Sequence, residues 1–143
     1  MMRPLATTLI LLSLSAAIGC SGGSGGREAQ QSTLRLTAVL YSQYLGAHGG
    51  DPPRDEGEFK KFIQSLGPGV IERAGLTSVD QLFTSPRDGQ PYAVKYQGVP
   101  WELEGAIAYE QQGLNGVRYV ATSLGGISEV TEEEFTKRLK KAN

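Results

Sequence analysis

The sequence predicts a single α+β domain over residues 32–143, in which a long N-terminal helix and short helices pack on a three-stranded antiparallel sheet, with a C-terminal helix. Two observations support this class. Apolar residues recur at helical spacing before residue 84, whereas after residue 91 they alternate with polar residues. A capping pattern near residue 131 then opens a last helix.

The helical part is predicted to begin with a helix from Ser32 to Ala47. Its apolar residues cover more than one face, so we expect a buried spine. Asp51-Pro52-Pro53 forces an extended exit, because a residue before proline is pushed out of the helical conformation. Asp55 and Glu58 fit a capping box that opens a second helix with an apolar stripe. Two further short helical turns are expected, one at Val70–Ala74 and one that Ser78 and Gln81 can cap.

The strand part follows the turn sequence Ser85-Pro86-Arg87-Asp88-Gly89. A first strand is predicted at Tyr92–Tyr96, where aromatic and apolar residues share one face. Two more are predicted at Ala106–Glu110 and Val117–Ala121. Between them, Gly113-Leu114-Asn115-Gly116 is a strong hairpin signal. The simplest topology is a three-stranded antiparallel meander.

The chain is predicted to close with a helix from Glu132 to Lys141. Thr131 and Glu134 form a capping box, and Val130 can pack on Phe135 as a hydrophobic staple. Acidic residues start this helix and basic residues end it, so both ends complement the helix dipole. We therefore attribute these charges to the helix itself and not to a binding patch.

The first residues carry the strongest functional signal. Arg3 precedes an apolar run from Leu5 to Ile18, and small residues follow up to Gly19, which is the order of a secretory signal. A membrane-spanning helix needs about 20 apolar residues, and this run is shorter and diluted by Ser and Thr. An export signal is the better interpretation.

The end of this run, Ala17-Ile18-Gly19-Cys20, resembles the lipobox of bacterial lipoproteins. The resemblance implies cleavage between Gly19 and Cys20 and lipidation of Cys20, which would anchor the protein to a membrane on its extracytoplasmic side. Residues 1–19 are then the signal and residues 20–31 a Gly/Ser-rich tether. A serine directly after the cysteine, here Ser21, resembles the sorting pattern of lipoproteins that are sent to an outer membrane.

The alternative interpretation is an ordinary secretory signal with an incidental cysteine. Because Cys20 is the only cysteine, no disulfide forms within the chain.

A second resemblance concerns the domain. Gly89-Gln90-Pro91-Tyr92, with Tyr96 and Pro100, is similar to the strand entry of the major type II secretion pseudopilin, and Ser123-Leu124-Gly125-Gly126 is similar to its later loop. The layout resembles the globular heads of type IV pilin-like proteins. That resemblance implies a loop at Leu124 to Val130, which here lacks the aspartates that bind calcium in the family.

Composition and motifs exclude several function classes. The chain has 14 basic and 15 acidic side chains, so it lacks the excess of positive charge that is typical of nucleic-acid-binding proteins. His48 is the only histidine, and one histidine with one lipidated cysteine cannot build a usual zinc site. Catalytic and phosphate-loop motifs are absent from the sequence. We therefore expect a non-enzymatic protein without a cofactor or metal.

A role as a cell-envelope interaction or assembly component is the favoured prediction. Trp101, next to a proline in the loop between two strands, is the leading candidate for contact with a protein partner, together with Tyr96 and Arg87. Trp101 could instead fold back over the sheet. The alternative function is a small-ligand or ion-binding module that uses the acidic loop Asp51–Glu58 and the Trp101 loop.

Overall fold

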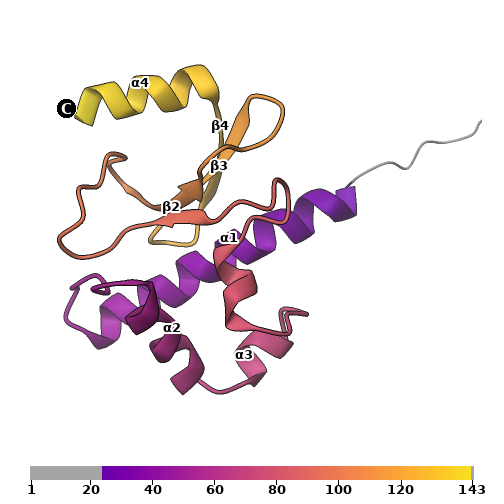
Figure 1. Ribbon diagram of the computed structural model, residues 1–143, viewed down its shortest axis with the longest axis vertical. Coiled ribbons are helices and arrows are strands. Elements are labelled where there is room, and N and C mark those ends of the chain that lie inside the picture. Colours follow the sequence, from indigo (N-terminus) through magenta and orange to yellow (C-terminus); the bar gives the residue numbers. More distant parts are fainter. Residues whose placement is uncertain (1–23, 143) are drawn as a thin grey trace, which may run out of the picture.

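A four-stranded antiparallel sheet lies between helix α1 (Ser24–Ala47) on one face and helix α4 (Glu132–Ala142) on the other (Figure 1). The structure, a computed structural model, describes residues 24–142, with side chains described for residues 33–139. The predicted signal and lipidation site, residues 5–20, lie outside the described residues. The α+β class and the C-terminal helix are confirmed.

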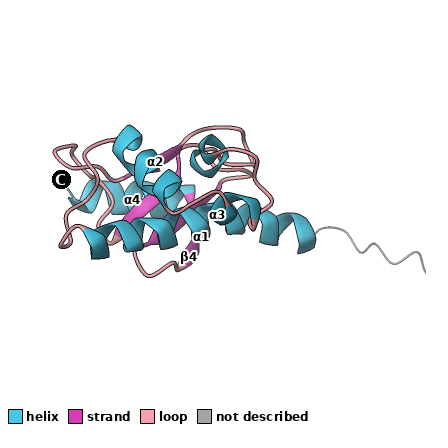
Figure 2. Ribbon diagram, turned by 90° about the horizontal axis from the view of Figure 1, so that it is seen from below, coloured by secondary structure: helices cyan, strands magenta, loops and turns pink. Residues whose placement is uncertain are grey.

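Helix α1 runs the length of the molecule along one flank (Figure 2). Leu34, Ala38, Tyr41 and Tyr44 are buried beneath the sheet, as expected for a spine. The helix begins at Ser24 and not at the predicted Ser32, so it includes the C-terminal part of the segment 20–31 that was assigned to the tether. The sequence REAQQ in this segment consists of good helix formers, which lets the helix extend past its buried part. In the described part of the chain, no helix is long and apolar enough to cross a bilayer.

Three short helices cover the rest of this side of the sheet: α2 (Glu56–Ser65), α3 (Gly69–Glu72) and the 3-10 helix η1 (Val79–Phe83). Asp55 caps α2 as predicted, because its Oδ1 accepts a hydrogen bond from Glu58 N at 2.8 Å. Phe59 of α2 is fully buried and meets the rings of Tyr41 and Phe83 edge-on, each at 5.6 Å between centroids. Such edge-to-face contacts hold α1, α2 and η1 together.

The sheet has four strands and not the predicted three. Strands β1 (Tyr92–Val94), β2 (Ala106–Glu110), β3 (Val117–Thr122) and β4 (Ile127–Thr131) follow each other in space in chain order. Strand β4 occupies the segment that was expected to be a loop. Its two apolar residues, Ile127 and Val130, pack on opposite faces of the sheet, toward α1 and toward α4. The strand therefore lacks the alternation by which strands are recognised.

The predicted hairpin joins β2 to β3 through a two-residue turn. Leu114 and Val117 exchange backbone hydrogen bonds of 2.9 and 3.1 Å, and Asn115 and Gly116 have φ values of 54° and 73°. Positive φ at both central residues is the type I′ geometry that Asn-Gly favours. At Gly113 a Cβ would lie 2.3 Å from Val117 O, so glycine is required there.

Helix α4 docks on the far face of the sheet through one arginine and an aromatic cluster. Arg118 of β3 donates to both carboxylate oxygens of Glu132, at 2.7 and 2.8 Å, and its guanidinium lies 4.3 Å from the centroid of Phe135. Phe135 in turn contacts Tyr109 at 5.1 Å between centroids. This second, smaller core fixes α4, and it includes Val130 as the predicted staple.

Acid should weaken the attachment of α4. Hydrogen bonds from Arg118 lower the pKa of Glu132 below its ordinary value of 4.5. A depressed carboxyl pKa stabilises the fold above the unfolded-state value, and this stabilisation is lost as the pH falls through the folded-state pKa. In urea unfolding from about pH 6 to about pH 3, the wild type should lose more stability than Glu132→Gln, which has no carboxyl to titrate. Equal losses in the two proteins would contradict this role for the ion pair.

Candidate functional site

The turn at residues 85–89 is folded against the end of the sheet and not extended into solvent. Ser85 N donates to Gln90 O at 2.8 Å, and Gly89 N donates to Ser85 O at 2.9 Å, which closes the turn. The carboxylate of Asp88 accepts from Gln90 N at 2.9 Å within the turn and from Gly113 N at 3.0 Å in the β2–β3 hairpin. The predicted turn is thus clamped to a hairpin more than twenty residues away.

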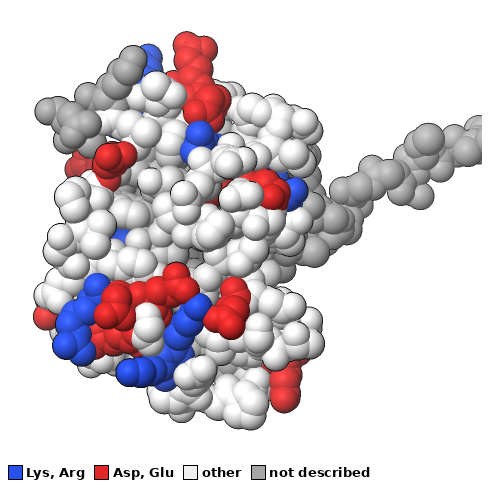
Figure 3. All heavy atoms as spheres, viewed as in Figure 1, with Lys and Arg blue, Asp and Glu red and all other residues white. Residues whose placement is uncertain are grey.

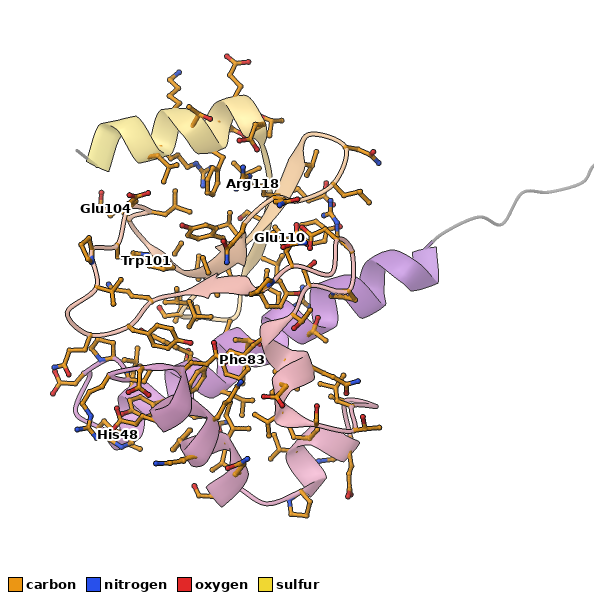
Figure 4. The ribbon with its side chains drawn as sticks, in the orientation of Figure 1. His48, Phe83, Trp101, Glu104, Glu110 and Arg118 are labelled. Carbon is orange, nitrogen blue, oxygen red and sulfur yellow. The ribbon has the colours of Figure 1, made fainter. Side chains whose placement is uncertain are left out.

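Beneath this turn lies a buried carboxylate, Glu110, at the end of β2 (Figure 4). Glu110 is 1% exposed. Its Oε1 accepts a hydrogen bond from Ser85 Oγ at 2.8 Å, and its Oε2 accepts one from Tyr119 N at 2.9 Å. Its cationic partner is Arg87, whose Nη1 lies 3.4 Å from Oε2. A buried charge needs such partners, because its desolvation cost is otherwise several kcal/mol.

Arg87 is held within the fold on every side of its guanidinium. Besides Glu110, it donates to the carbonyl oxygens of Leu114 and Val117, both at 3.1 Å. Its guanidinium carbon also lies 4.2 Å from the centroid of the Tyr119 ring. Its side chain is 7% exposed. Arg87 was predicted as a partner contact, but these contacts make it the clamp between the turn and the β2–β3 hairpin.

Trp101 folds back over the sheet, which is one of the two placements left open by the sequence. Its Nε1 donates to Ala106 O at 2.8 Å, and its ring lies 5.3 Å from that of Tyr109 between centroids. Trp101 is half-buried against the core beneath α4. It lies in the β1–β2 loop near the start of β2, whereas Glu110 lies at the end of β2 (Figure 4). Trp101 and Arg87 therefore do not form one contact surface.

Tyr96, the third predicted contact, packs on the opposite side of the sheet from Trp101, against the core formed with α1. Its hydroxyl oxygen is buried and has no hydrogen-bond partner among the described residues. Burial raises the pKa of the Tyr96 phenol, so the group stays protonated at all ordinary pH values. The three predicted contact residues thus belong to three separate parts of the fold.

The acidic loop Asp51–Glu58 is used to build α2. Glu58 accepts from the side chain of Arg54 at 3.1 Å, and Lys60 bridges Glu56 and Asp80 at 2.5 and 2.7 Å. Figure 3 shows acidic and basic side chains side by side over this region. Within the described residues, no three His, Cys, Asp or Glu side chains are grouped so that they could hold a metal ion.

His48 closes the exposed end of α1. Its ring stacks on that of Tyr44 at 3.9 Å between centroids, and its Nδ1 lies 2.8 Å from Tyr44 O (Figure 4). Phe62 of α2 meets the same ring edge-on at 5.9 Å. These contacts give His48 a structural place at the junction of α1 and α2.

A groove between α2 and α3 was not predicted. It has a volume of about 550 Å³ and an apolar floor that includes Ile63, Ile71 and Leu76. Gln64 and Glu72 supply polar groups in its wall. Pockets of this size and character are typical of small-ligand sites. The only sequence signal was Gly67-Pro68-Gly69, which predicts where α2 ends and not the angle at which α3 leaves it.

Comparison of the chain with models of known protein families, with curated proteins and with solved structures finds no match. The similarity to lipoprotein signals and to pseudopilin heads therefore stays a prediction from the sequence.

Removal of the Arg87 charge should destabilise the domain strongly. In Arg87→Met the buried Glu110 loses its cation, and breaking a buried pair costs about 3–5 kcal/mol. Arg54→Met, which removes an exposed pair with Glu58, is the matched control and should have little effect. Urea unfolding measures both. The double variant Arg87→Met/Glu110→Gln should be more stable than Arg87→Met alone, and similar midpoints for Arg87→Met and Arg54→Met would contradict the clamp.

Proposed function

We propose that this chain is a lipid-anchored protein of the bacterial cell envelope, exported and held on the extracytoplasmic side of a membrane, where it acts as a non-enzymatic interaction or assembly component. The observation that carries the proposal is the single cysteine, Cys20, placed directly after an apolar run and small residues. Acylation of that cysteine attaches two or three chains, and each buried methylene contributes about 0.8 kcal/mol to membrane binding.

The short distance between Cys20 and α1 supports an anchored role. The helix begins at Ser24, and from Leu34 onward one side of it is buried in the core. The proposed anchor therefore lies a few residues before a helix that is part of the core, so the domain would be held close to the membrane. The absence of a second cysteine leaves packing and the Glu110 cluster to hold the domain together.

The pilin-like head is also part of the proposal. A long N-terminal helix packed on a small antiparallel sheet is the layout that the resemblance implied. Assembly with other envelope proteins is consistent with that layout, but folds host many functions, so the argument for assembly depends on the anchor.

Cys20→Ser should abolish lipid attachment. In bacteria grown with labelled palmitate, the wild-type chain should carry the label and sediment with membranes, whereas Cys20→Ser should carry none and leave the membrane fraction. Ser21→Ala changes the neighbouring residue without removing the thiol, so it should keep the label. Retention of label and membrane sedimentation by Cys20→Ser would refute the lipoprotein proposal.

The groove between α2 and α3 favours a second candidate function, the binding of a small apolar ligand. This alternative moves the ligand site away from the acidic loop and the Trp101 loop, since the side chains there are engaged within the fold. The apolar floor and the few polar side chains of the groove suit a ligand with an apolar body and one polar end.

Filling the groove tests the ligand hypothesis. Val79 lines the groove, so Val79→Trp should weaken the binding of the fluorescent probe anilinonaphthalene sulfonate by about tenfold, which corresponds to about 1.4 kcal/mol. Val99→Trp is the control, because Val99 is exposed in the β1–β2 loop and does not line the groove. Unsaturable probe binding by the wild type, or equal affinity in both variants, would count against a ligand site here.

A further inference from the structure

One flank of the molecule combines the outer side of α1 with the tight turn between β3 and β4 (Figure 2). The turn is tied to the helix, because Ser42 Oγ donates a hydrogen bond to Ser123 O. Gly125 lies against Val39, so that an added Cβ would be 3.2 Å from Val39 Cγ2. Gly125 N also donates to Thr122 O at 3.0 Å, which closes the turn. The turn is therefore a fixed projection from this flank.

The projection has an apolar tip with balanced charges around it. Leu124 is 95% exposed, and Val39 beside it is 40% exposed. Arg35 lies one helical turn from Val39 on the same exposed stripe of α1. Glu129 of β4, which accepts a hydrogen bond from the Tyr119 hydroxyl at 3.3 Å, lies on the α1 side of the sheet. Among the residues whose side chains are described, the flank thus presents an aliphatic tip together with the basic Arg35 and the acidic Glu129.

We propose that this flank lies on the bilayer that holds the Cys20 acyl chains, with Leu124 inserted at the headgroup level; the inference rests on the proposed lipid anchor. The length and position of α1 make the contact possible. Ser24 follows Cys20 by four residues, and the helix from Ser24 to Val39 spans about 22 Å at about 1.5 Å per residue. When α1 lies along the membrane surface, the anchor and the Leu124 turn reach the same plane.

The size of the apolar tip favours a lipid surface over a protein partner. A stable protein interface buries about 1,600 Å² in total, and two aliphatic side chains supply only a small part of that. A weak contact is sufficient next to an anchor, because the anchor makes the second contact intramolecular and raises its effective concentration. Since the contact proposed here is made by an aliphatic side chain, it needs no anionic lipid.

A fluorophore at position 124 tests this orientation in the intact lipidated protein. Cys20 is the only native cysteine, and lipidation consumes its thiol, so Leu124→Cys provides a single free thiol for a nitrobenzoxadiazole label. The protein is reconstituted into phosphatidylcholine vesicles containing a lipid with a shallow nitroxide quencher. Leu114→Cys is the matched control: it is also an exposed leucine, at the other end of β3.

Insertion predicts at least about a twofold larger quenching at position 124 than at 114, because groups buried roughly 5–10 Å into the headgroup boundary lie within reach of the quencher. Equal quenching at the two positions, in protein that floats with the vesicles, would overturn the orientation and leave the anchor intact. Protein that does not float would instead refute the proposed anchor. If position 124 cross-links to another protein in cells and the label in vesicles is not quenched, Leu124 contacts a protein partner and not the membrane. That result would also overturn the inference.

Discussion

The buried carboxylate of Glu110 is the interaction on which one end of the sheet depends. It accepts hydrogen bonds from Ser85 Oγ and the backbone N–H of Tyr119 and pairs with the guanidinium of Arg87, so the 85–89 turn, β2 and β3 meet at one charge. Because the site is closed to water, each partner stabilises the others, and the loss of one leaves a desolvated charge. The turn before β1 and the β2–β3 hairpin are consequently held as a unit.

The two faces of the sheet are covered by cores of different size and composition. The α1 face is closed by a large core in which rings from α1, α2 and η1 meet edge-on around Phe59. The α4 face is small, and it combines a short aromatic series from Trp101 to Phe135 with the ion pair of Arg118 and Glu132. The α4 face depends on a carboxylate whose pKa is lowered by Arg118, so acid weakens this attachment.

Because of these contacts, residues that the sequence suggested for partner binding are engaged inside the domain. Arg87 and Trp101, the polar and aromatic residues most suggestive of a partner site, satisfy groups inside the domain. Two surface features that those residues do not form are the α2–α3 groove and the flank with Leu124. If the proposed anchor at Cys20 holds the domain, α1 begins four residues after it, so the flank with Leu124 would face the membrane and the groove, which other elements form, would stay open to a ligand.

The sequence by itself determined the α+β class, the caps at Asp55 and Thr131, and the Asn115-Gly116 turn, because each depends on residues close together in the chain. It also located the candidate lipidation site at Cys20, which local motif spacing alone predicts. Only the tertiary structure decided that Ile127–Thr131 is a strand, since its two apolar residues serve opposite faces. It likewise decided the roles of Arg87 and Glu110 and the existence of the groove, because those depend on contacts between distant segments that no local pattern encodes.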